Sequence, residues 1–169
     1  MIKLCRAGLF VVALLASAFA AAQGKIAVLD VQGAILNTEA AQKQLKDLRA
    51  QPAYTQNRKE LDKLKKDYDD IIKQLQKDLA VMSADQKEAQ RKKIEEKRAD
   101  LEHVARKLQA SEQELAQRLI QEMAPKLEKI VSDLIKSEGI GLLLDRKAAM
   151  HADPSYNITE KVTAALNKG

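Results

Sequence analysis

Residues 58–90 read RKELDKLKKDYDDIIKQLQKDLAVMSADQKEAQ, a charged segment in which apolar side chains return every three or four positions. This spacing places the apolar residues on one face of an α-helix and the charged residues on its other faces. The sequence therefore predicts a long amphipathic helix that needs a partner along its apolar stripe. The stripe consists of Leu61, Leu64, Tyr68, Ile71, Leu75, Leu79 and Met82.

A second stripe with the same spacing follows, which predicts that two helices pack against each other. Between the stripes, Ser83-Ala84-Asp85-Gln86 has the pattern of a capping box that begins a helix. We expect an antiparallel coiled-coil hairpin over residues 38–127, with its tip at about Val81–Asp85. The second stripe consists of Ile94, Leu101, Val104, Leu108, Leu115, Leu119 and Met123.

Helix-breaking residues are scarce in the long charged region. From Thr38 to Glu138 there is no glycine, and the only prolines are Pro52 and Pro125. Proline in a helix removes one backbone hydrogen bond. We therefore expect Pro52 to kink or break the first arm near its base, and Pro125 to do the same in the second arm.

The two ends of the chain predict a small β-containing body, residues 23–37 plus 128–169. Residues 25–31 and 140–144 read as apolar strands, and a weaker strand is predicted at 148–152. Asn157-Ile158-Thr159-Glu160 predicts a capped helix at the C-terminus. So few short strands make a marginal sheet, which favours closure by oligomerisation. The strand residues expected to build it are Ile26, Val28, Leu29, Val31, Ile140, Leu142, Leu143 and Leu144.

The first 22 residues have the layout of a secretory signal peptide. Lys3 and Arg6 precede an apolar run and a series of small residues, and cleavage after Ala22 or after Ala20 fits the pattern. The net charge is +5, and becomes +3 without Lys3 and Arg6. We therefore expect an exported chain with a cleaved leader. Because the single cysteine, Cys5, lies inside that leader, the mature chain has no disulfide or thiol chemistry.

Catalytic and cofactor-binding patterns are absent from the sequence. The two histidines, His103 and His151, stand alone without metal-ligand spacing, and no phosphate-binding glycine loop or nucleophile elbow occurs. Basic runs such as residues 91–93 are interspersed with acidic residues, which favours a solvated helix face over a nucleic-acid site. We expect no enzyme activity, no metal, no cofactor and no nucleic-acid partner.

Both ends of the chain resemble the Skp/OmpH family of periplasmic chaperones. The resemblance rests on Lys25–Val31, Asn37–Ala41, Leu142–Asp145 and Asp153–Thr159. It implies a homotrimer with a small β body and helical arms, which binds unfolded outer-membrane proteins without ATP in the periplasm. It also implies contact with lipopolysaccharide in some members, and anionic lipid is a further candidate partner. No residue of this chain is assigned to lipopolysaccharide, and the basic runs such as residues 91–93 are the candidates for contact with anionic lipid headgroups.

Apolar residues on the arms are the candidates for contact with unfolded clients. They are Tyr68, Ile72, Val81 and Met82. Packing inside the hairpin is the alternative for each of them, and Ile72 is the better contact candidate because it lies off the main stripe. A second hypothesis is a structural envelope protein whose coiled hairpin bridges folded partners. A third, a basic nucleic-acid-binding protein, is disfavoured by the leader and the interspersed acidic residues.

Overall fold

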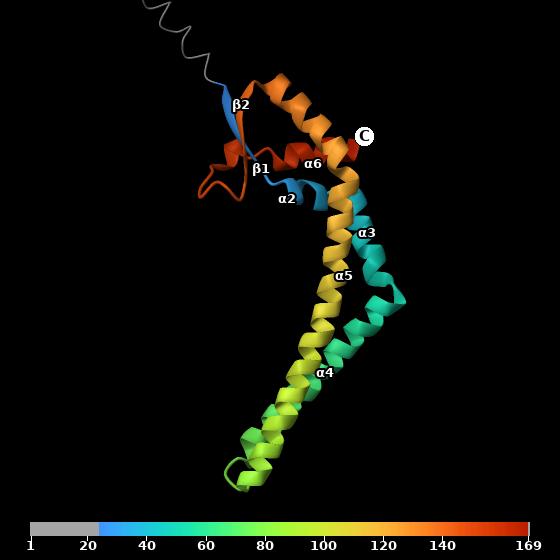
Figure 1. Cartoon of the computed structure of the whole chain (residues 1–169), viewed down its shortest axis with the longest axis vertical. Helices are drawn as coiled ribbons and strands as arrows, with labels where there is room; N and C mark the ends of the chain where they lie inside the picture. The colour runs from blue at the N-terminus through green and yellow to red at the C-terminus, as the bar shows by residue number, and fades with distance from the viewer. Residues whose placement is uncertain (1–23, 169) are drawn as a thin grey trace, which may run out of the picture. The chain divides into compact units, whose positions relative to one another are not determined.

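The computed structural model describes residues 24–168, so the predicted leader and its cleavage positions lie outside the described residues. The chain is mainly helical with one two-stranded sheet, which confirms the predicted fold class (Figure 1). It divides into two compact units. One unit contains residues 24–39 and 120–168, and the other contains residues 40–119.

The unit of residues 40–119 is a helical hairpin. Its first arm consists of α3 (Glu39–Ala50) and α4 (Pro52–Asp78), and its second arm is the first part of α5 (Ala84–Glu138). The predicted capping box is confirmed, because Ser83 N donates to Gln86 Oε1 (2.9 Å) and Gln86 N donates to Ser83 Oγ (3.3 Å). The turn spans residues 79–83 and thus begins two residues earlier than predicted.

An apolar cluster joins the two arms. Leu61 and Leu64 of α4 are buried against Val104 and Leu108 of α5, and Tyr54 and Leu101 pack on this cluster. These residues come from the two predicted stripes, with Tyr54 added. In this part of the hairpin the two apolar stripes therefore pack against each other, as their spacing predicts.

The two prolines behave differently. The first arm breaks at Gln51, and Pro52 becomes the first residue of α4, where the missing N–H is tolerated. Pro125 lies inside α5, which continues to Glu138, so no break occurs there, and the kink expected at Pro125 stays a prediction. Pro125 is exposed, whereas Leu119 and Leu127 on either side are buried. Burial of residues on both sides of the proline favours continuation of the helix despite the lost hydrogen bond.

The other unit is built on a parallel pair of strands, β1 (Lys25–Leu29) and β2 (Ile140–Asp145). Val31 was predicted in the first strand, but it is the first residue of α2 (Val31–Leu36). The physical reason is Asp30, whose carboxylate accepts a hydrogen bond from Gly33 N (2.8 Å) and caps this helix. The strand therefore ends before Val31.

The weaker strand predicted at residues 148–152 does not form. After β2 the chain turns, with Ala148 N donating to Asp145 O (3.0 Å), and continues without regular structure to a 3₁₀ turn at Pro154–Tyr156. A strand needs a neighbour, and the side of β1 away from β2 is taken by Asn157 and Ile158, whose N–H donates to Val28 O (2.9 Å).

The C-terminal helix, α6 (Thr159–Lys168), covers this small core. The polar pattern predicted to begin this helix forms a turn at its entrance, because Asn157 Oδ1 accepts from Thr159 N (3.0 Å), and the first helical bond then runs from Val162 N to Ile158 O (3.0 Å). Val162 and Leu166 are buried, and Thr163 Oγ1 donates to Ala34 O of α2 (3.0 Å). α6 thus packs on α2 and completes the unit.

Two glycines shape the entry to β2. Gly139 has φ of 65° at the end of α5, a left-handed backbone that favours glycine. A Cβ at Gly141 would lie only 2.9 Å from the Cα of Gly24, so the two backbones approach as closely as they do because both residues lack side chains.

Candidate functional site

The turn between α4 and α5 exposes apolar side chains. Val81 is 85% exposed and Leu79 is 50% exposed. Met82, Tyr68 and Ile72 are half-buried, and Met82 lines a shallow hollow of about 450 Å³ together with Val81. Of the four predicted contact residues, Val81 is therefore the one most accessible to a partner.

Leu79 was predicted to pack on the stripe, and its exposure is what sequence reasoning missed. The apolar cluster of the hairpin ends at Leu64 and Leu101, and the stripe residues closer to the turn are less buried. A spacing of three and four residues predicts which side chains share a face, but not whether the partner helix covers that face.

The β strands leave an apolar surface of their own. Ile26 and Leu142 pair in register, and each is 48% exposed. Val28, Leu29 and Ile140 are buried, whereas Leu143 and Leu144 are half-buried. Val31 lies in α2 and not in the sheet.

Beside this surface lies a hollow of about 340 Å³. Ile26 and Leu144 reach it from the strands, and Tyr156, which is 47% exposed, reaches it from the 3₁₀ turn. Within residues 24–168, β2 has a strand beside it on one edge only, that of β1. Its other edge offers backbone hydrogen-bonding groups of the kind that pair with another chain.

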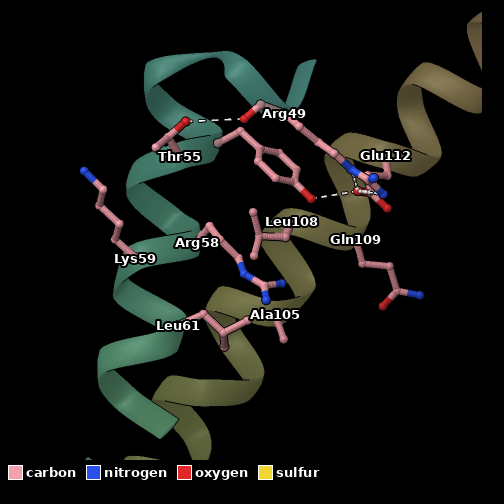
Figure 2. A pocket seen from close by; sticks show the side chains of 10 residues that line it. Arg49, Thr55, Arg58, Lys59, Leu61, Ala105, Leu108, Gln109 and Glu112 are labelled. Carbon is pink, nitrogen blue, oxygen red and sulfur yellow. Dashed lines mark hydrogen bonds and ion pairs between the residues drawn. The ribbon is translucent and has the colours of Figure 1, made fainter. Parts of the chain in front are cut away.

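A polar cluster lies where α3 meets α4 (Figure 2). Tyr54 Oη donates to Glu112 Oε1 (2.7 Å), and Arg49 Nε donates to the same oxygen (3.0 Å). The Tyr54 hydrogen bond, together with Arg49, lowers the pKa of Glu112. Contact with the Glu112 carboxylate raises the pKa of Tyr54 and of Arg49. The three side chains line a cavity of about 680 Å³ between α4 and α5.

This cluster could not be found from sequence spacing. Glu112 stands 63 residues from Arg49 and 58 residues from Tyr54. The one sequence signal was the break expected at Pro52, which marks where the first arm changes direction but names no side-chain partner.

We searched the described residues for clusters of possible metal ligands. Across residues 24–168, no three His, Cys, Asp or Glu side chains come together as metal ligands would. His103 and His151 are both exposed.

Within residues 24–168, none of the helices combines the length and apolar character that crossing a bilayer requires.

Comparison with known proteins gives matches over nearly the whole described chain. The model of the family described as "Outer membrane protein (OmpH-like)" matches residues 25–166. A "Skp-like protein" of Pseudomonas aeruginosa is 27% identical over 160 residues, which is 95% of this chain and 94% of that protein. The crystal structure of an OmpH-like protein from Caulobacter crescentus CB15 is 21% identical, with a TM-score of 0.44, and the match covers 87% of this chain and 86% of that one.

Proposed function

Because this chain belongs to the OmpH-like family of outer membrane proteins, we propose that it is an ATP-independent periplasmic holding chaperone. In this role it binds unfolded outer-membrane proteins and keeps them from aggregating. The observation that carries the proposal is the exposure of Val81 and Leu79 on an otherwise charged hairpin. Exposed apolar side chains in a solvated surface favour contact with apolar segments of another chain.

The composition of the hairpin supports a protein that retains unfolded clients and does not fold them. Its apolar contacts are few and separated by charged residues, so each contact with a client is weak. Several weak contacts on linked arms retain a chain without fixing one conformation. The surrounding charge keeps the loaded complex in solution. The leader predicted at residues 1–22, cleaved after Ala22 or Ala20, supports export to the compartment where such clients pass.

The sheet unit supports assembly into a homo-oligomer, which we take to be a trimer on the family resemblance. Ile26 and Leu142 present apolar surface, and within residues 24–168 no strand lies beside the edge of β2 that faces away from β1. Joining these surfaces between copies buries the apolar residues and completes the sheet. Several hairpins attached to one body supply the linked weak contacts that holding requires.

Client holding is tested by diluting a urea-unfolded outer-membrane β-barrel into buffer containing the mature protein, without nucleotide. Light scattering reports aggregation. We expect the protein to suppress scattering, and Val81→Asp to require a several-fold higher concentration for the same effect. Gln76→Asp is the matched control, because Gln76 is also exposed and the same charge is added without loss of apolar surface.

The results for the variant and for the wild-type protein test two different statements, where the client binds and whether the protein is a chaperone. Suppression that is unchanged in Val81→Asp would move the client contacts away from the turn and leave the function in place. Scattering that is unchanged by the folded wild-type protein would contradict the chaperone proposal. It would favour a coiled hairpin that bridges folded envelope partners.

Anionic lipid or lipopolysaccharide is a second candidate partner, favoured by Arg91, Lys92 and Lys93. All three are exposed near the beginning of α5, although Lys92 pairs with Glu88 (3.1 Å). Attraction between such residues and anionic headgroups weakens with salt. Salt-sensitive co-sedimentation with anionic vesicles, absent for neutral vesicles, is the expected result, and no sedimentation at low salt would contradict it.

A further inference from the structure

The joint between α3 and α4 is a single residue. Gln51 has an extended backbone, with φ of −61° and ψ of 140°, and Pro52 begins α4. Because proline has no N–H, it cannot continue the hydrogen bonding of α3, which ends with Gln51 N donating to Leu48 O (3.1 Å). A joint of this kind has few backbone restraints of its own, so side chains decide whether it is fixed.

Side chains from both sides of the joint meet on one carboxylate. Arg49 lies in the last turn of α3, and Tyr54 lies in the first turn of α4. Both contact Glu112 Oε1 on α5, Tyr54 through its hydroxyl at 2.7 Å and Arg49 through Nε at 3.0 Å and Nη2 at 2.9 Å (Figure 2). A second tie crosses the joint, because Thr55 Oγ1 donates to Arg49 O (3.3 Å).

The two helices depend on this carboxylate to different degrees. α4 is also held to α5 by the apolar cluster of Leu61, Leu64, Val104 and Leu108. α3 also has contacts with α5 away from the joint, where Arg118 Nη2 donates to Gln44 Oε1 (3.5 Å), and Ala41 of α3 is buried. Loss of the Glu112 contacts would leave the apolar cluster of α4 intact and free the end of α3 at the joint, next to Gln51.

The electrostatics of the cluster favour the closed arrangement. The contacts with Tyr54 and Arg49 lower the pKa of Glu112, which keeps its carboxylate ionised near neutral pH. Hydrogen bonds to an ionised acceptor are stronger than those between neutral groups. The nearby Arg58 pairs with Asp62 (3.5 Å) on the surface of α4, so the charge of Arg58 is partly neutralised by the Asp62 carboxylate and not by Glu112.

We infer that Arg49, Tyr54 and Glu112 form a latch that fixes the angle between α3 and α4, and that opening the latch turns Gln51–Pro52 into a hinge. The latch is polar and half-exposed, so it opens at a lower free-energy cost than the apolar cluster beside it. All of these contacts lie within the hairpin unit, so the latch can be tested without a client, and a failure of client binding would not contradict it.

Distances between α3 and α4 test the latch directly. Spin labels are placed by Lys46→Cys on α3 and Lys73→Cys on α4, both exposed positions, in a chain that also carries Cys5→Ser. Labelled chains are mixed with excess unlabelled chains, so that each oligomer carries one labelled copy. Pulsed electron–electron double resonance then measures the distance between the two labels within that copy. We expect a narrow distance distribution for the parent, and at least a doubling of its width in Tyr54→Phe combined with Glu112→Gln.

Glu102→Gln is the matched control. It removes a carboxylate that contacts Arg98 Nε at the same distance, 3.0 Å, but within α5 alone, so the distribution should not change. An unchanged distribution in the latch variants, with helix content retained, would overturn the inference. If Glu112→Gln fails to fold, Tyr54→Phe decides, because it removes one hydroxyl from a half-buried ring. A lower melting temperature without broadening also overturns the latch.

Discussion

Gly139 ends α5 with φ of 65°, and a Cβ there would meet open space. Any effect of Gly139→Ala therefore reports backbone strain and not a steric clash. We expect the variant to lose about 1 kcal/mol of unfolding free energy, measured by urea unfolding at fixed protein concentration. Gly139→Asn, which tolerates the left-handed region better, should recover part of the loss. An alanine variant as stable as the parent would contradict this account of the helix end.

Glu112 gives the hairpin a pH-dependent contribution to stability. Tyr54 from α4 and Arg49 from α3 face its carboxylate and lower its pKa in the folded protein, and Arg58 and Lys59 line the same cavity. The contribution is therefore complete above the pKa of an unfolded Glu, about 4.3, and is lost as the pH falls through the lower folded pKa.

The pH dependence is measured on the parent and Glu112→Gln in parallel. At pH 7 we expect the parent to be more stable by about 1 kcal/mol, a modest value because the Glu112 side chain is 35% exposed. The difference should shrink as the pH falls from 7 toward 3. A difference that stays constant or grows in acid would contradict the assignment of an ionised Glu112.

Among the helices and strands, α5 begins with the most clearly defined local signal. Ser83 and Gln86 exchange hydrogen bonds across the first turn, at 2.9 and 3.3 Å. Ser83→Ala should weaken this end of the helix by about 1 kcal/mol. Because the turn is exposed, we expect faster amide hydrogen exchange at Gln86 and Lys87 with little change in global unfolding. Unchanged exchange there would show that the capping box does not hold the helix end.

Elements whose signals are local could be predicted from the sequence. The capping box, the break at Pro52 and the polar turn at Asn157 are all present in the structure. The terminal strands also pair, a distant contact that follows from two apolar segments flanking one hairpin. Prediction failed where a distant partner decides. Residues 148–152 have strand character but find no strand beside them among residues 24–168. The Arg49–Tyr54–Glu112 latch likewise joins residues that only the folded hairpin brings together.

For the whole molecule, assembly should depend on the exposed face of the sheet. Ile26 and Leu142 pair in register at 48% exposure each, which a stable interface would bury. We expect Ile26→Asp combined with Leu142→Asp to convert the proposed oligomer to monomers, as measured by light scattering coupled to size exclusion. Lys25→Asp is the control, because Lys25 is exposed on the same strand but presents no apolar surface. An unchanged mass for the double variant would place the interface elsewhere.

If the protein holds an unfolded chain in the absence of nucleotide, the two form a complex whose mass can be measured. The mature protein is mixed with a urea-unfolded outer-membrane β-barrel, diluted, and analysed by native mass spectrometry. We predict one client bound per oligomer, with the client still protease-sensitive and therefore unfolded. A protein that stays folded and oligomeric but leaves the client to aggregate, or that binds only the folded β-barrel, would contradict the account.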